Sequence, residues 1–232
     1  MPIFNNHDPL PPIHPGECHV ACALAVDNSS SMSGNPIAEL NSGLVEFGNA
    51  LEQDPLAQGR AEVTVISFNS SVNTEMSFRP ATEYEAPTLS AGGLSTMNEA
   101  INIALDALEA RKAEYRANGI RYYRPWLFLL TDGAPTDTQL ESSTRTRLQK
   151  AIKEKKVVYL PIGISEQTDI AKLQIYYPDN AIARPVLKAN ASNFKEAFQW
   201  LSASIVEVTH SDPTTTTEVQ TPELPTGFTL AL

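Results

Sequence analysis

Residues 20–32 read VACALAVDNSSSM, a continuous apolar run that ends abruptly at Asp27 and is followed by Asn28 and three serines. A short apolar run without alternation is typical of a parallel strand that helices cover on both faces. Asp27 would then lie at the carboxyl end of this strand, which is where open parallel sheets bind their ligands. The stretch therefore predicts both a central strand and a polar site at its end.

Other segments of the chain extend this pattern. Further apolar runs occupy Val63–Phe68, Trp126–Leu130 and Val157–Ile164, with another strand candidate near Arg184–Leu187. Apolar residues at helical spacing lie between or after them, within residues 37–51, 97–108, 140–152 and 194–208. This alternation predicts an α/β fold with a doubly wound, mostly parallel central sheet and helices on both faces. Residues 72–78 are predicted to form a short antiparallel edge strand beside the Val63 run.

Length and composition favour one domain. The 232 residues suit one large α/β unit. Residues 1–16 form a polar, proline-rich segment, and residues 210–232 form a Thr/Pro-rich tail that we expect to lack a fixed fold until its apolar end. The predicted domain is residues 17–209. The N-terminal segment lacks the basic and apolar regions of a secretory signal, so we expect a cytoplasmic protein.

Charge and hydropathy exclude two classes of partner. The formal net charge is −10, which disfavours nucleic acid, and no apolar stretch approaches the ~20 residues needed to cross a membrane. A basic, tyrosine-containing segment could suggest a nucleic-acid patch, but we interpret it as a solvated helix end; its cations are Arg111, Lys112, Arg116, Arg121 and Arg124.

The cysteines do not suggest a cross-link or a zinc site. Cys18 and Cys22 lie roughly 13 Å apart on a strand, too far for a disulfide. His14 and His19 lie nearby in the sequence, but residues of opposite strand parity cannot converge on one tetrahedral metal. We therefore expect two buried free thiols.

Oxygen-bearing side chains gather in three segments. Asp27-Asn28-Ser29-Ser30-Ser31 follows the first strand, residues 92–97 read GGLSTM before a helix, and Thr131-Asp132-Gly133 follows the Trp126 run. Carboxylates and hydroxyls, without His or Cys, are the ligands that hard cations such as Mg²⁺ prefer. The three segments together predict a metal site.

In their order and placement these segments resemble the metal-ion-dependent adhesion site of von Willebrand factor A domains, over about residues 18–208. The resemblance implies a Rossmann-like fold with one Mg²⁺, or Mn²⁺ or Ca²⁺. Ser29 and Ser31 would ligate the metal directly, and Asp27 and Asp132 largely through water. One coordination position would take water or an Asp or Glu of a partner protein. The family usually has Gly between the two serines, so Ser30 would carry a steric cost if that position required positive φ.

The third hydroxyl ligand has two candidates, Ser95 and Thr96. In the family this ligand lies two residues before an apolar position and five before a small one. Met97 and Ala100 occupy those positions here, which favours Ser95. Thr96 and Glu99 have the spacing of a capping box at the start of the helix.

A finer resemblance comes from residues 122–137, YYRPWLFLLTDGAPTD. This stretch is similar to the bacterial TerY-like branch of the family, which is associated with tellurite resistance and stress response. That branch implies a cytoplasmic domain that works beside other proteins. Asp137, at the end of the stretch, is assigned to the turn before the next helix and not to the metal site.

Two other classes of function were weighed against a non-catalytic binding module. A phosphoryl-transfer or hydrolase enzyme could use Asp27 as a nucleophile beside Mg²⁺. However, no second Asp follows two residues on, and no downstream Lys clearly accompanies it. A nucleotide-binding Rossmann domain needs a glycine-rich phosphate loop, and neither of the usual patterns occurs in the chain. A metal-dependent protein-binding module, with no catalytic residue, is the predicted function.

Overall fold

Strand β1 (Cys18–Asp27) runs through the middle of the sheet, and all ten of its residues are buried. It pairs in parallel with β2 (Ala61–Phe68) on one side and β5 (Trp126–Thr131) on the other. Burial on both faces explains why its sequence is continuously apolar and does not alternate. The structure is a computed structural model that describes residues 16–132, 135–165, 168–181, 186–189, 194–211 and 229–231.

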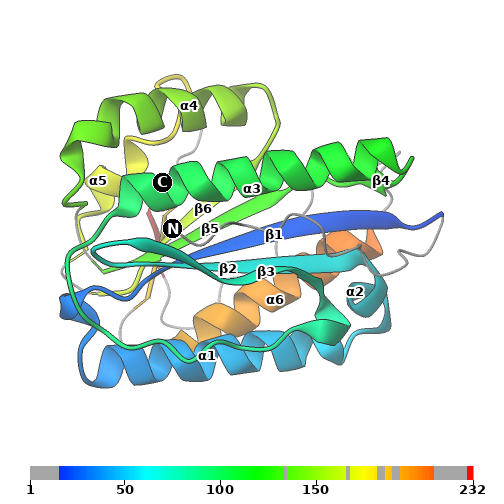
Figure 1. Cartoon of the computed structure of the whole chain (residues 1–232), viewed down its shortest axis with the longest axis horizontal. Helices are drawn as coiled ribbons and strands as arrows, with labels where there is room; N and C mark the ends of the chain where they lie inside the picture. The colour runs from blue at the N-terminus through cyan, green and yellow to red at the C-terminus, as the bar shows by residue number, and fades with distance from the viewer. Residues whose placement is uncertain are drawn as a thin grey trace.

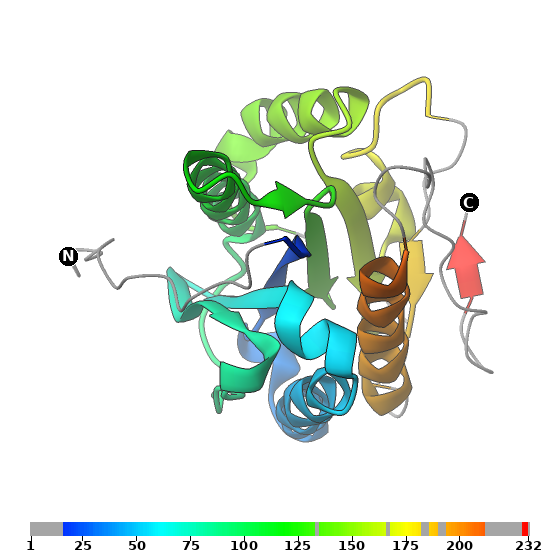
Figure 2. The same cartoon turned by 90° about the vertical axis from the view of Figure 1, so that its right-hand side faces the viewer.

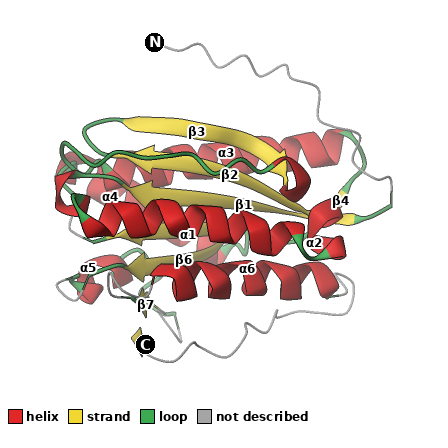
Figure 3. Cartoon of the chain, turned by 90° about the horizontal axis from the view of Figure 1, so that it is seen from below, coloured by secondary structure: helices red, strands yellow, loops and turns green. Residues whose placement is uncertain are grey.

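The sheet has the strand order β3-β2-β1-β5-β6-β7-β8, and β4 (Arg121–Tyr122) pairs with the start of β1. Strands β6 (Val158–Gly163) and β7 (Val186–Lys188) continue the parallel part. At the edges, β3 (Val72–Pro80) is antiparallel to β2, and β8 (Thr229–Ala231) is antiparallel to β7. Figure 3 shows the arrow of β3 running opposite to those of β1 and β2. The predicted fold class is confirmed, although β3 extends two residues beyond the predicted edge strand.

Helices cover both faces of the sheet, as Figures 1 and 2 show. One face carries α1 (Asn35–Glu52), α2 (Pro55–Arg60) and α6 (Phe194–His210). The other face carries α3 (Met97–Ala117), α4 (Glu141–Lys153) and α5 (Ile170–Gln174). Short 3₁₀ turns lie at Ser30–Met32, Ala81–Glu83 and Thr138–Leu140. None of the helices in the described ranges is both long and apolar enough to cross a membrane.

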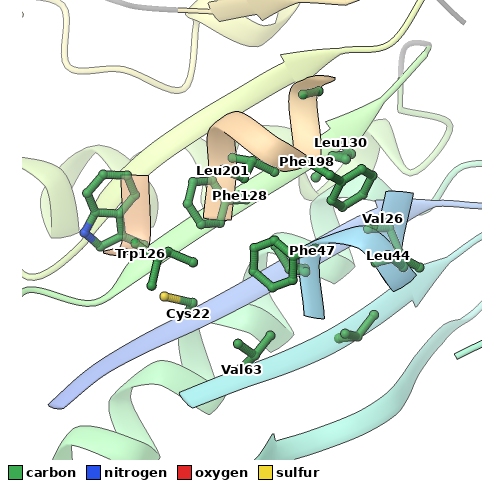
Figure 4. Close-up of a cluster of buried hydrophobic side chains, with 14 of the residues drawn as sticks. Cys22, Val26, Leu44, Phe47, Val63, Trp126, Phe128, Leu130, Phe198 and Leu201 are labelled. Atoms are coloured by element: carbon green, nitrogen blue, oxygen red, sulfur yellow. The ribbon is translucent and has the colours of Figure 1, made fainter. Parts of the chain in front are cut away.

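The core between the sheet and the α1/α6 layer is closely packed (Figure 4). Phe47 of α1 meets Phe198 of α6 edge-on, with ring centroids 6.2 Å apart. Gly43 of α1 makes this approach feasible, because a Cβ there would lie 2.1 Å from the Phe198 ring. Cys22 packs in the same core as a free thiol, and burial raises its pKa. The prediction of buried free cysteines is confirmed, since Cys18 is also buried and unpaired.

A buried charged group lies toward the start of β2. Glu62 accepts hydrogen bonds from Arg111 Nε and from the Tyr115 hydroxyl, and its Oε1 lies 3.5 Å from His19 Nδ1. Burial raises the pKa of Glu62, but the contacts with His19 and Arg111 outweigh it and hold the pKa below the usual range. The interpretation of the basic segment as solvated is therefore wrong for Arg111 and for its neighbour Lys112. Both are buried; Arg111 pairs with Glu62, and Lys112 pairs with Glu109.

Candidate metal site

The candidate site lies where the strand order of the sheet reverses. β2 and β3 lie on one side of β1, and β5 and the later strands lie on the other. Asp27 is the last residue of β1, and Asp132 directly follows the last residue of β5. Because β1 and β5 are parallel neighbours, their carboxyl ends meet at this switch point. The topology thus brings together two carboxylates that are more than a hundred residues apart in the sequence.

Asp27 is fully buried, and hydrogen bonds fix both of its carboxylate oxygens. Oδ1 accepts from the Ser29 backbone N–H at 2.9 Å. Oδ2 accepts from Thr131 Oγ1 at 2.8 Å and from Ser95 Oγ at 3.2 Å. Burial raises the pKa of Asp27; hydrogen bonds from Ser29 and Thr131 oppose the rise, and the nearby charge of Asp132 adds to it. The net effect is a raised pKa, which means that the ionised carboxylate is destabilised at this position.

The serines after Asp27 lie in a tight turn that begins at its carboxylate. The Met32 N–H donates to the Ser29 carbonyl at 3.0 Å, which closes the 3₁₀ turn. Ser29 Oγ and Ser31 Oγ lie 3.0 Å apart, and Ser31 Oγ donates to Asp132 Oδ1 at 2.9 Å. Ser29 thus contacts Asp27 through its backbone N–H, and its hydroxyl contacts the hydroxyl of Ser31, which donates to Asp132. Among the described residues other than glycine, only Lys155 has a positive φ, so Ser30 does not have one. The serine at the position where the family usually has glycine therefore causes no backbone strain.

Ser95 joins the cluster from the loop before α3. Its hydroxyl donates to Asp27, as given above, and its side chain is buried. Its backbone N–H donates to Thr136 Oγ1 at 3.1 Å, and its carbonyl accepts from the Thr136 N–H at 2.8 Å. This pairing fixes the loop that carries Ser95 against the loop that follows β5.

Thr96 does not join the cluster and does not cap the helix. It is the N-cap residue of α3, but its side chain makes no capping hydrogen bond, and its hydroxyl is buried without a partner. Asp137 takes that role: Oδ2 accepts from the Glu99 N–H at 2.8 Å, and Oδ1 accepts from the Asn98 N–H at 3.2 Å and from Asn98 Nδ2 at 3.0 Å. The predicted capping box is wrong. Thr96 has φ −88° and ψ 53°, outside the extended region that capping residues usually adopt.

Three residues around the cluster were not assigned a role in it from the sequence: Thr131, Thr136 and Asp137. Thr131 could have been found, because it directly precedes Asp132 at a strand end whose hydroxyls were already suspected. Thr136 and Asp137 contact residues 41 and 38–39 positions away, respectively. No local sequence pattern specifies contacts of that kind.

The donor atoms fit a hard divalent cation. The candidate set is Asp27, Ser29, Ser31, Ser95 and Asp132, which offers only carboxylate and hydroxyl oxygens. Within the described ranges no three His, Cys, Asp or Glu side chains form a metal-binding group, so the two carboxylates depend on hydroxyls to complete a site. Oxygen-only donors of this kind are typical of Mg²⁺, Mn²⁺ or Ca²⁺ sites.

Three solved structures that share this fold illustrate its relatives. The pilus adhesin SpaC from Lactobacillus rhamnosus GG matches with a TM-score of 0.64 and 15% identity, over 84% of this chain and 31% of that chain. A von Willebrand factor type A protein from Catenulispora acidiphila matches with a TM-score of 0.60 and 15% identity, over 82% and 43%. Proximal thread matrix protein 1 from the mussel byssus, with a zinc-occupied MIDAS motif (the abbreviation of metal-ion-dependent adhesion site), matches with a TM-score of 0.53 and 14% identity, over 82% and 48%.

These structures are longer than this chain, which spans less than half of each. At such low identities they show a shared fold. A search of curated proteins found no match. The sequence profile of the von Willebrand factor type A domain matches residues 23–199, most of the chain, from β1 to α6. The chain therefore belongs to the von Willebrand factor type A domain family.

Proposed function

We propose that this domain binds one divalent cation, Mg²⁺ or alternatively Mn²⁺ or Ca²⁺, and uses it to hold an acidic residue of a partner protein. The observation that carries the proposal is the hydrogen-bonded cluster at the switch point. Ser31 links to Asp132 and to Ser29, while Ser95 links to Asp27. Domains of this family are typically interaction modules, and one structural neighbour holds zinc at its corresponding motif.

The charge of the site suits an incoming carboxylate. Two protein carboxylates roughly neutralise a divalent ion, so an Asp or Glu from a partner meets a site that is not yet overcharged. In the proposed arrangement Ser29 and Ser31 ligate the ion directly, whereas Asp27 and Asp132 act largely through water. The bound ion supplies a directed contact for the partner's carboxylate, and the protein supplies the fixed oxygen donors.

Ser95 is the proposed third hydroxyl ligand, in preference to Thr96. Ser95 Oγ already points at the Asp27 carboxylate, 3.2 Å away. The Thr96 hydroxyl makes no hydrogen bond to any member of the cluster. We expect Ser95→Ala to weaken metal binding and Thr96→Ala to spare it.

An enzyme that uses Asp27 as a phosphoryl acceptor is less well supported. Asp27 is fully buried, and its two oxygens accept hydrogen bonds from Ser29, Ser95 and Thr131. A nucleophile needs access to its substrate, and this carboxylate offers none. Its geometry favours holding an ion over forming a covalent intermediate.

Calorimetric titration with MgCl₂ and MnCl₂ tests the metal site. The wild-type chain should bind one ion, and Asp27→Ala should abolish binding. Asp106→Asn is the matched control, because it removes one negative charge from an exposed position on α3 that pairs with Arg147. If the wild type shows no metal-dependent heat, or if Asp27→Ala binds as well as the wild type, the proposed site is wrong.

Affinity capture from a native lysate, with and without a chelator, tests the dependence of partner binding on the metal. Chelation and Asp132→Ala should each abolish capture of the partner. Capture that survives both treatments would place the interface elsewhere on the domain.

We also propose that the chain belongs to the TerY-like branch of the family and that it lies in the cytoplasm. They rest on the likeness of residues 122–137 and on the composition of the N-terminal segment. Co-expression with tellurite-resistance proteins, followed by capture in the presence of Mg²⁺, tests the branch assignment. Loss of the gene without any change in tellurite tolerance would count against it.

A further inference from the structure

We propose that Leu94 selects the partner: the acidic residue that reaches the metal site is flanked by an apolar side chain, on a segment that carries no other charge. This inference rests on the proposed metal-dependent binding and specifies the chemistry of the partner. It concerns the surface that contains and surrounds the proposed ligands Ser29, Ser31 and Ser95. This surface is formed by residues 28–34, 69–71 and 90–96, and we call it the uncharged rim.

Leu94 is the most exposed large apolar side chain in the described ranges. Its exposed fraction is 60%, and the other large apolar residue with a high exposed fraction is Val45 of α1, at 49%. The next residue along the chain, Ser95, turns inward to Asp27. Leu94 therefore stands at the edge of the site, one residue from a proposed ligand. A single exposed leucine is ordinary on a protein surface. The inference therefore rests on the position of Leu94 next to Ser95 and on the hydrogen bonds that hold its loop.

Hydrogen bonds hold the loop that presents Leu94. The Leu94 N–H donates to Ser70 Oγ at 2.9 Å, and the Gly93 carbonyl accepts from the Ser30 N–H at 3.1 Å. Gly92 N–H donates to the Asn28 carbonyl at 2.9 Å. Gly93 has φ +79°, and a Cβ there would lie 2.4 Å from Ser70 Oγ, so the close approach of the two loops needs glycine. The leucine is thus presented on a fixed loop, which lowers the entropy cost of binding through it.

The rim around Leu94 has an unusual charge pattern for this chain. The formal net charge of the protein is −10, yet residues 28–34, 69–71 and 90–96 contain no Asp, Glu, Lys or Arg. Apart from the metal site, these three segments therefore offer a partner no charged side chain that would pair with it or repel it. Its exposed groups are serine hydroxyls, amides and one leucine. A partner segment with one acidic residue beside an apolar one matches this surface better than a polyacidic or a basic segment does.

Titration of the isotope-labelled full chain by NMR in excess MgCl₂ tests the inference. The probes are two short blocked peptides that are identical except for a central Asp-Leu or Asp-Ser, and a third peptide that contains a run of aspartates. We expect the wild type to bind Asp-Leu about threefold to tenfold more tightly than Asp-Ser, from burial of part of the leucine surface. Leu94→Asn should remove this preference, and the control Val45→Asn should keep it.

The outcomes separate this inference from the metal site. Leu94→Asn should bind Mg²⁺ as the wild type does, because Leu94 contributes no ligand. Equal affinity of the wild type for Asp-Leu and Asp-Ser, or tighter binding of the aspartate run, would overturn the role of Leu94. Failure of every peptide to bind while Mg²⁺ still binds would do the same and leave the metal site standing. Failure of Mg²⁺ itself to bind would overturn the proposed function.

Discussion

Asp137→Ala should destabilise the domain, because Asp137 caps helix α3 across the loop after β5. Its carboxylate accepts hydrogen bonds from the backbone N–H groups of Asn98 and Glu99 and from Asn98 Nδ2. Asp137 and Asn98 are both buried. The substitution leaves the Asn98 N–H without its acceptor in a place that water reaches poorly. Asn98 Nδ2 keeps the Asp137 carbonyl, 3.3 Å away, and Glu99 is exposed, so its N–H can be rehydrated.

The expected loss follows from these three bonds. A lost N-cap typically costs about 1 kcal/mol, and the one buried donor left unsatisfied costs about 1–3 kcal/mol. Together they predict a decrease of about 3 kcal/mol in the free energy of unfolding. For a domain of this size that corresponds to a fall in Tm of about 6–12 °C. Asp137→Asn, which keeps one acceptor oxygen, should lose less.

Urea unfolding followed by circular dichroism, at neutral pH with chelator present, measures this loss. Thr96→Val is the matched control, because the buried Thr96 hydroxyl has no partner to lose. Its effect should stay within about 0.5 kcal/mol. A larger loss from Thr96→Val than from Asp137→Ala would refute the assignment and restore the capping box that the sequence suggested.

Three further substitutions test the buried groups. The pKa of Asp27 is raised in the folded state, so folding favours the protonated carboxyl group. The stability that this group contributes is fully present below its ordinary pKa of 3.8 and is lost as the pH rises through the folded-state pKa. Asp27→Asn should therefore raise the urea midpoint of the metal-free protein at neutral pH, with the two midpoints converging below pH 3.8. Glu62 has a lowered pKa, so its contribution is present above its ordinary value of 4.5 and is lost as pH falls through the folded pKa. Glu62→Gln should cost about 3–5 kcal/mol at neutral pH, because Arg111 loses its buried counter-charge and keeps only the half-exposed Glu114. The urea midpoint of this variant should fall less than that of the wild type on acidification; equal acid sensitivity would contradict this. Gly43→Ala should cost about 1–3 kcal/mol by displacing the Phe198 ring, and an unchanged Tm would show that α1 and α6 can separate freely.

The sequence predicted the strands better than the short helices, for a physical reason. A strand buried on both faces must be apolar throughout, so the run from Val20 to Val26 is visible without any alignment. Helices α2 and α5 have six and five residues, fewer than two turns, so no apolar periodicity can develop in them. The far end of β3 was missed because this strand is only partly buried and carries Arg79 and Pro80.

The candidate site could be predicted in part because neighbouring parallel strands end at the same edge of the sheet. Once β1 and β5 are neighbours, residues that follow them must meet, and Asp27 and Asp132 do so. The choice of Ser95 over Thr96 came from register, and the hydrogen bond from Ser95 to Asp27 supports it. The capping role of Asp137 depends on how the loop after β5 folds back onto α3, and residue spacing contains no signal for that.

Two buried carboxylates on adjacent strands show what the candidate site requires. Glu62 on β2 has Arg111 as a buried counter-charge, and its pKa is lowered. Asp27 on β1 is at least as buried, but among the described residues its hydrogen-bond partners are only hydroxyls and a backbone amide, and its pKa is raised. A carboxylate kept in such a position costs stability unless a positive charge compensates it. The fold supplies that charge to Glu62 from a side chain, whereas at Asp27 the neighbouring groups are a second carboxylate and oxygen donors suited to a divalent ion. This difference is the physical reason for expecting Mg²⁺ or a similar cation to stabilise the domain, an effect that thermal unfolding with and without the ion would measure directly.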